Sequence, residues 1–278
     1  MKLPAFLLTP FVASTLVHAV PEGAAGAAAP ADSVTQICVI PLGVVPELVP
    51  ELKNGVMGFA QEREGTRPPA PAQWWLHNKE GGYLAMSLNA PAEIITVKGK
   101  EAVGIRIAGP PDSQGKPSWK PWIEIPVAAP GKPQSVFLTK SSPKEDWLAA
   151  PKQWPFDDSP EAFPPGCIRV VNLSSITEFV VIGEQKLQIP PGRQTIVHPP
   201  ADVVSIHVGV QGGAQVVPTL NTARKVEGPE RIVLATFDWD TGSRPGDLVT
   251  PAKSAILYMP SPLPAADATT DAQHPVVH

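Results

Sequence analysis

The chain has 278 residues, with 22 Lys and Arg against 26 Asp and Glu, and its formal net charge is −4. This balance speaks against nucleic acid and anionic membrane surfaces as partners, because both attract basic proteins. Proline is the compositional outlier: 36 residues are proline, and they are spread along the chain. Proline removes a backbone donor and clashes with the preceding helical turn, so the composition excludes long helices and favours many short strands.

Residues 1–19 are predicted to be a secretory signal peptide. Lys2 supplies a positive start, Leu3 to Leu16 is mostly apolar, and Val17-His18-Ala19 fits the small-x-small cleavage rule. The alternative, a buried N-terminal strand, is disfavoured by two prolines within the run. No later apolar run approaches the length needed to cross a bilayer, so we expect no membrane span after cleavage. The sequence thus predicts export to the periplasm or the extracellular space.

Residues 20–33 contain mostly Ala, Gly and Pro and are predicted to be a flexible leader. A β-sandwich domain is expected over 34–140, with strands bounded by Pro, Gly and Asn. Leu48 and Leu52 are four residues apart, which favours one helical turn within 46–53, interrupted by Pro50. The expected strands are 37–40, 56–60, 74–78, 83–89, 93–97, 103–108, 122–127 and 135–139.

The stretch 141–162 is polar, rich in proline and weakly periodic, which predicts a linker between two domains. A second sandwich is expected over 163–260, and the tail 261–278 is predicted to be disordered. Within the second sandwich, strands are expected at 167–173, 178–182, 187–189, 203–210, 214–217, 231–238 and 254–259. The sequence therefore predicts an all-β protein with one or two immunoglobulin-like sandwiches, in tandem if there are two, and with proline-rich loops.

The two halves contain similar segments. Glu93 to Val97 followed by Gly99 resembles Glu178 to Ile182 followed by Gly183, and Ile125 to Val136 resembles Ile189 to Ile196. Duplication would explain both matches. The common strand and turn residues of any sandwich would also produce them, so both explanations stay open.

The segment from Phe163 to Val197 carries a family resemblance. Phe163-Pro164-Pro165-Gly166 leads into Ile168 to Ser174, and Pro190-Pro191-Gly192 closes the next hairpin. This arrangement resembles exported bacterial β-sandwich proteins of uncharacterised function. The resemblance implies location and fold, and no catalytic motif accompanies it.

The only two cysteines are Cys38 and Cys167. An exported chain reaches an oxidising compartment, where these residues could form a disulfide that closes a long loop. The alternative is two separate buried thiols that act as small hydrophobes.

Acidic residues and histidines are the candidates for chemistry. Asp238, Asp240 and Asp247 cluster around a turn, where oxygen ligands could hold calcium, although the turn alone explains them. His198 and His207 lack the spacing of a metal motif and are expected to be surface or structural residues. If the protein were a hydrolase, the first candidates for its catalytic residues would be Asp238, Asp240 and His207. The sequence predicts no cofactor and no catalytic site.

Aromatic residues suggest a binding surface. Trp74 and Trp75 are adjacent and point to opposite faces of a strand, and Trp122 lies on another predicted strand. Exposed rings would fit a carbohydrate-binding module, whereas burial would make these residues part of the core. We expect an exported structural or interaction module that binds an unknown protein or glycan partner at the cell envelope. A secreted hydrolase is the remaining alternative.

Overall fold

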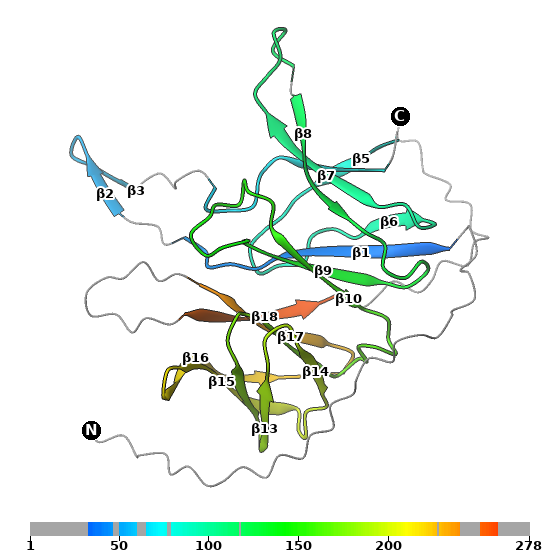
Figure 1. The fold of residues 1–278 in the computed structure, drawn as a ribbon. Coiled ribbons are helices and arrows are strands. Elements are labelled where there is room, and N and C mark those ends of the chain that lie inside the picture. Colours follow the sequence, from blue (N-terminus) through cyan, green and yellow to red (C-terminus); the bar gives the residue numbers. More distant parts are fainter. Residues whose placement is uncertain are drawn as a thin grey trace.

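The computed structural model describes residues 33–46, 50–59, 65–76, 79–116, 118–226, 228–239 and 251–260. Every regular element in these ranges is a β-strand, which confirms the predicted all-β class (Figure 1). The predicted signal peptide, most of the predicted leader and the predicted disordered tail lie outside the described residues.

Two four-stranded sheets form the N-terminal sandwich. The N-inner sheet has the strand order β10-β9-β1-β6, and the N-outer sheet has the order β5-β4-β7-β8. In the N-inner sheet, β1 pairs in parallel with β9 and antiparallel with β6. The bounds are β1 Val34–Pro41, β4 Ala72–Leu76, β5 Lys79–Leu84, β6 Ile95–Lys98, β7 Val103–Gly109, β8 Ser118–Ile125, β9 Gln134–Thr139 and β10 Lys152–Asp157.

Two further four-stranded sheets form the C-terminal sandwich. The C-inner sheet has the order β14-β11-β17-β18, and the C-outer sheet has the order β13-β12-β15-β16. Here β11 pairs in parallel with β17 and antiparallel with β14. The bounds are β11 Ile168–Leu173, β12 Glu178–Ile182, β13 Gln185–Ile189, β14 Gln194–Val197, β15 Val203–Gly212, β16 Gln215–Lys225, β17 Arg231–Asp238 and β18 Ala252–Met259.

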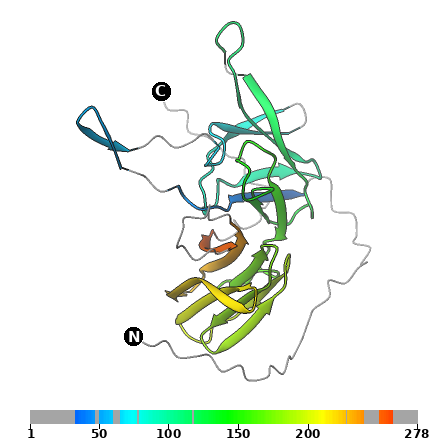
Figure 2. The same ribbon diagram turned by 60° about the vertical axis from the view of Figure 1, so that its left-hand side comes forward.

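The four sheets form successive layers, with the two inner sheets facing each other (Figures 1 and 2). One buried cluster fills each sandwich, and a third joins Ile40 and Phe137 of the N-inner sheet to Val171 and Ala235 of the C-inner sheet. The inner sheets are therefore covered on both sides. This explains why β9 and β11 are buried at every position, their polar residues included.

The two sandwiches share one strand order. If β1 and β4 to β10 are matched in chain order to β11 to β18, both inner sheets and both outer sheets have the same order of strands. In each inner sheet the first strand, β1 or β11, also pairs in parallel with the matching strand, β9 or β17. This correspondence supports duplication, but it corrects the alignment of the sequence matches. The segment around β6 was matched to β12, whereas the topological counterpart of β6 is β14. Short strands bounded by glycine look alike in sequence whatever their place in a sheet.

Among the departures from the sequence-based expectations, two concern segments for which no strand was expected. Residues 50–53 form strand β2 (Pro50–Lys53), which pairs with β3 (Val56–Phe59), so the predicted helical turn is wrong over these residues, and 47–49 lie outside the described residues. The stretch 141–162, predicted to be a linker, contains β10, which pairs with β9 along its whole length.

Candidate functional site

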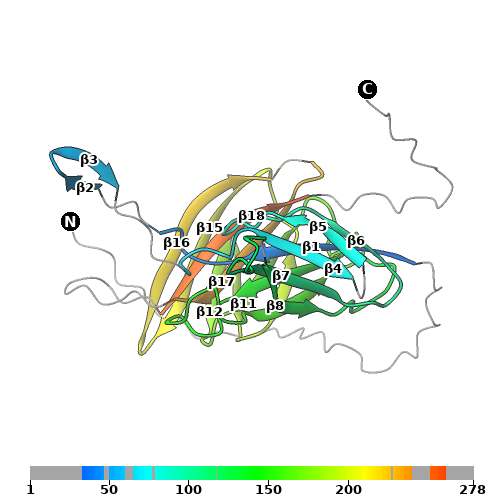
Figure 3. The same cartoon turned by 90° about the horizontal axis from the view of Figure 1, so that it is seen from above.

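The β2–β3 hairpin stands apart from the layered body of the molecule (Figures 1 and 3). Its turn is Asn54-Gly55, and both residues have positive φ, 54° and 79°. This is the backbone of a type I′ turn, whose twist matches that of the paired strands and for which Asn-Gly is the preferred sequence. The Asn-Gly pair could have revealed the hairpin from sequence.

The register of the hairpin sorts its side chains into two faces. Residues directly opposite in an antiparallel pair share a face, so Pro50 and Phe59 lie on the same side as Leu52 and Met57. We call these four residues the hairpin apolar face. Leu52, Met57 and Phe59 are 65%, 68% and 66% exposed. The described structure therefore leaves a wholly apolar surface in contact with solvent.

The opposite face of the hairpin is mixed. Glu51 and Lys53 form an ion pair, with Lys53 Nζ 3.1 Å from the Glu51 carboxylate, and Val56 beside the turn is 70% exposed. Within the described residues, β2 and β3 pair only with each other, so each also has an open backbone edge. A two-stranded hairpin is marginally stable alone in water, which makes further contacts at this site favourable.

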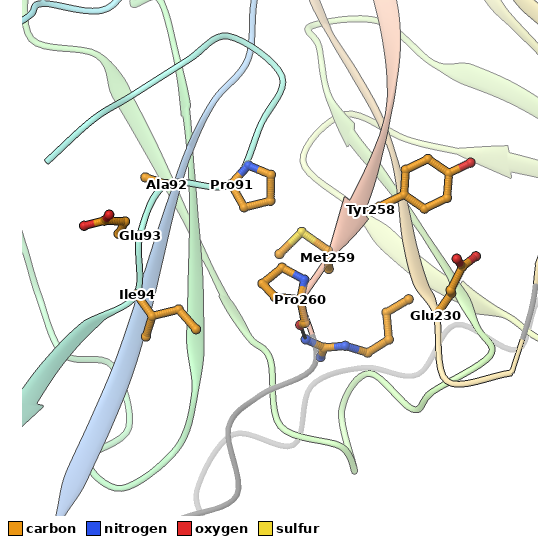
Figure 4. Close-up of a pocket in the computed structure, with 9 residues that line it drawn as sticks. Pro91, Ala92, Glu93, Ile94, Glu230, Tyr258, Met259 and Pro260 are labelled. Atoms are coloured by element: carbon orange, nitrogen blue, oxygen red, sulfur yellow. Dashed lines mark hydrogen bonds between the residues drawn. The ribbon is translucent and has the colours of Figure 1, made fainter. Parts of the chain in front are cut away.

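A second candidate region is a cleft of about 600 Å³ between the two sandwiches. Pro91 and Ile94, just before β6, face Met259 and Pro260 at the end of β18 (Figure 4). Arg231 also lines the cleft, yet it is buried and donates hydrogen bonds to Asp158 and to the Pro260 carbonyl oxygen. The principal cation at the cleft is thus already held by the protein itself.

Asp158 links the sandwiches through two buried arginines. Its carboxylate lies 3.4 Å from Arg169 Nη1 and 3.2 Å from Arg231 Nη2, and all three side chains are buried. The Phe163 ring lies 4.3 Å from Arg169 Cζ and 5.0 Å from Arg231 Cζ, a geometry that favours both cations. Burial raises the pKa of Asp158, and the nearby guanidiniums oppose that rise. This cluster joins the N-inner sheet to the C-inner sheet, and we call it the Asp158 clamp.

Glu178 is a second buried acid, inside the C-terminal sandwich. Thr236 donates to its Oε1 at 2.6 Å, and the chain of hydroxyls continues to Ser254 at 2.8 Å and from there to Thr219 at 2.7 Å. Burial raises the pKa of Glu178 to about 8, while the hydrogen bond from Thr236 lowers it. At neutral pH the carboxyl group is therefore mostly protonated and joins the two sheets as an uncharged group.

Of the acidic and histidine candidates for a hydrolase, the structure describes Asp238 and His207, and it does not bring these two together. Asp238, at the end of β17, accepts hydrogen bonds from the backbone N–H and the hydroxyl of Ser175. His207 is exposed on β15 while its neighbours Ile206 and Val208 are buried, so its side chain points away from the C-inner sheet. Asp240 and Asp247 lie outside the described residues. No cluster of three metal-ligating side chains occurs among the residues that the structure describes.

Both cysteines are free and buried, so the structure has separate thiols in place of the possible disulfide. Cys38 lies on β1, and burial raises the pKa of its thiol to about 12. Cys167 just precedes β11, and its Sγ lies 3.1 Å from Nδ1 of the exposed His198. The contact to His198 was not apparent from the sequence, because 31 residues separate the two.

The predicted aromatic patch is divided by the sheet. Trp74 packs against the core of the N-terminal sandwich, and Trp122 is buried with its indole N–H directed to the Ala149 carbonyl oxygen. Of the three predicted tryptophans, only Trp75 lies on the solvent side of the N-outer sheet, because side chains alternate along β4. A patch formed by Trp74, Trp75 and Trp122 together is therefore wrong.

No family model and no curated protein matches this chain. Among the described residues there is also no helix long and apolar enough to cross a membrane.

Proposed function

We propose that the chain is an exported, non-catalytic interaction protein that binds a protein partner through the hairpin apolar face. The single observation that carries this proposal is the exposure of Leu52, Met57 and Phe59 on one side of a projecting hairpin. Export rests on the N-terminal sequence pattern of residues 1–19. We also propose that each sandwich is immunoglobulin-like. We further propose that the chain is related to the exported bacterial β-sandwich proteins that it resembles.

Comparison of the two sandwiches supports a role for the hairpin other than folding. The hairpin is inserted between β1 and β4, whereas the corresponding strands β11 and β12 are joined by residues 174–177 alone. The same strand order therefore forms without it. An insertion that exposes apolar side chains costs solubility, so retaining it points to a contact surface.

The size of the face indicates the kind of partner. Four side chains are far fewer than the roughly 20–30 residues per side of a standard interface, so two hairpins packed face to face would associate only weakly. A partner with an apolar groove could close over both faces and also cover Val56. Its backbone could in addition pair with the open edge of β2 or β3, as in recognition by strand addition. We therefore assign the hairpin to a grooved protein partner.

The candidate hydrolase residues do not favour an enzyme. Asp238 is engaged by Ser175, and His207 projects from the far side of the C-outer sheet. The described geometry thus places the C-outer sheet between His207 and the strand that carries Asp238. An active site built on this pair is not proposed.

Site-specific photo-crosslinking in cells that export the protein tests the proposal. A photoreactive residue at Val56 should give a discrete crosslinked protein product, and the triple substitution L52S/M57S/F59S should abolish it. The matched control is E51S/K53S on the other hairpin face, which should retain the product, and a photoreactive residue at Val216 should not form it. Equal products from both positions would refute the assignment.

A further inference from the structure

The solvent side of the N-outer sheet carries an aromatic surface that the hairpin does not use. Trp75 on β4, Tyr83 on β5 and Trp119 on β8 share this side, because each is paired in register with outward residues of the neighbouring strands. Tyr83 is 70% exposed. The rings come from three strands of one rigid sheet, which fixes their relative positions.

Trp75 is held in place by its neighbours on β7. Its indole ring lies directly against Gly104, its register partner, and a Cβ at that position would overlap the ring. Arg106 lies on the same side, with its Cζ 4.7 Å from the centroid of the Trp75 ring. Glycine is thus required at 104 for the ring to lie flat, and the stacked guanidinium presents its N–H groups beside an aromatic surface.

Tyr83 and Trp119 meet above the middle of the sheet. Their ring centroids are 6.3 Å apart at an interplanar angle of 63°, although β5 and β8 are the two edge strands. Such contact requires small or flat residues beneath, and Ala108 is the register partner of Trp119. The two rings make an edge-to-face pair whose open side faces solvent.

Polar groups of both kinds border the rings. Arg106 is the register partner of Gln73, and Glu124 is the register partner of Gly104 beneath Trp75. The surface therefore offers cationic donors, an amide and a carboxylate acceptor. Among the side chains that the structure describes on this side, Arg106 and Glu124 carry opposite charges, and this mixed set does not resemble the basic surface that a nucleic acid requires.

We propose that this aromatic surface, formed by Trp75, Tyr83, Trp119, Arg106, Gln73 and Glu124, binds a neutral glycan. A pyranose ring has an apolar C–H side that packs on aromatic rings and a rim of hydroxyl groups that both donate and accept hydrogen bonds. The rings supply the apolar contact, and the flanking side chains supply partners for the rim. The described charged side chains of this surface, Arg106 and Glu124, are of opposite sign, so they favour an uncharged ligand that can both donate and accept hydrogen bonds.

Binding of defined oligosaccharides to the full chain tests this proposal. The probes are four neutral hexasaccharides: cellohexaose, chitohexaose, maltohexaose and xylohexaose. Isothermal titration should show at least one of them binding with a dissociation constant of about 1 mM or tighter. Tyr83→Ala should weaken that binding roughly two- to ten-fold, the effect expected for loss of one aromatic contact.

The chain offers a matched control, because its only other tyrosine is Tyr258, which is also exposed and lies on β18. Tyr258→Ala should bind the glycan like the unmodified chain, as should the hairpin variant L52S/M57S/F59S. Arg106→Gln keeps a hydrogen-bonding side chain, removes the charge and should weaken binding without unfolding the sheet. The proposal is overturned if no probe binds at 10 mM, if only charged polysaccharides bind, or if Tyr83→Ala and Tyr258→Ala have equal effects.

Discussion

The two sandwiches are built on one strand order and differ most in a single connection. Between β1 and β4 the N-terminal sandwich carries the β2–β3 hairpin, whereas residues 174–177 suffice between β11 and β12. The shared part buries most of its apolar side chains in the cores of the sandwiches, whereas Leu52, Val56, Met57 and Phe59 of the added part are all exposed. The difference separates what the fold needs from what has been added to it.

A second difference lies inside the sandwiches. β12 begins with the buried Glu178 at the place where its counterpart β4 begins with the buried Ala72. The C-terminal sandwich thus contains a buried acid with its own hydroxyl partners, and the matching strand of the N-terminal sandwich starts with a small apolar residue. We expect the two halves to respond differently to pH, although the Asp158 clamp joins them.

The largest expected effect concerns that clamp. Asp158→Ala would leave two buried guanidiniums without their carboxylate, and breaking a buried ion pair in this way costs about 3–5 kcal/mol. Urea unfolding should show this loss. The neighbouring Asp157 pairs with Lys132 nearer the surface, so Asp157→Ala should cost about 1 kcal/mol or less. Equal losses in the two variants would mean that Asp158 does not join the sandwiches.

The next effect is the pH dependence of Glu178. Its pKa rises from 4.5 to about 8 on folding, so between these values the native state keeps a proton that the unfolded state has lost. The contribution of Glu178 to stability is therefore complete below pH 4.5 and declines by roughly 1.4 kcal/mol per pH unit up to about pH 8.

Glu178→Gln keeps an uncharged, hydrogen-bonding side chain and should remove this decline. Unfolding free energies measured in urea at pH 5, 6, 7 and 8 provide the comparison. A variant whose stability falls as steeply as that of the unmodified chain would show that another group is responsible.

The smallest expected effect concerns the thiols, which sit at matching first strands of the two halves. A disulfide between them would add roughly 4–5 kcal/mol in the chain-entropy model. Because Cys38 and Cys167 are free, a reductant should leave the unfolding midpoint unchanged. Thiol titration should give two reactive groups in the unreduced, denatured protein. A titre of zero together with a lowered midpoint on reduction would contradict the structure.

Composition and turn residues predicted the fold class because they act locally. Proline excludes the interior of a helix, and pairs such as Pro191-Gly192 allow a reversal through the positive φ of Gly192, 68°. The prediction of a helical turn within 46–53 is wrong at 50–53 for a related, local reason. Asn54-Gly55 fixes a tight hairpin turn, and this makes Pro50–Lys53 a strand despite the helical spacing of the leucines.

The contacts that join distant parts of the chain could not be predicted from the sequence. Arg231 is 73 residues from Asp158, and Asp158 falls in a stretch that the sequence assigned to a linker. Nothing local marks either residue as buried, since charged residues are normally exposed. Likewise, alternation placed Trp74 and Trp75 on opposite faces, but only the arrangement of the sheets decides which face meets solvent.

The most direct test of the central claim is to remove the hairpin. Pro50 and Phe59 are directly opposite in the register, so replacing residues 50–59 by Gly-Gly closes the gap without moving β1 or β4. Urea unfolding of this variant should give a free energy within about 1 kcal/mol of the unmodified chain, because the exposed hairpin buries little. A loss of several kcal/mol would contradict the account, since the hairpin would then belong to the fold and not to a contact with a partner.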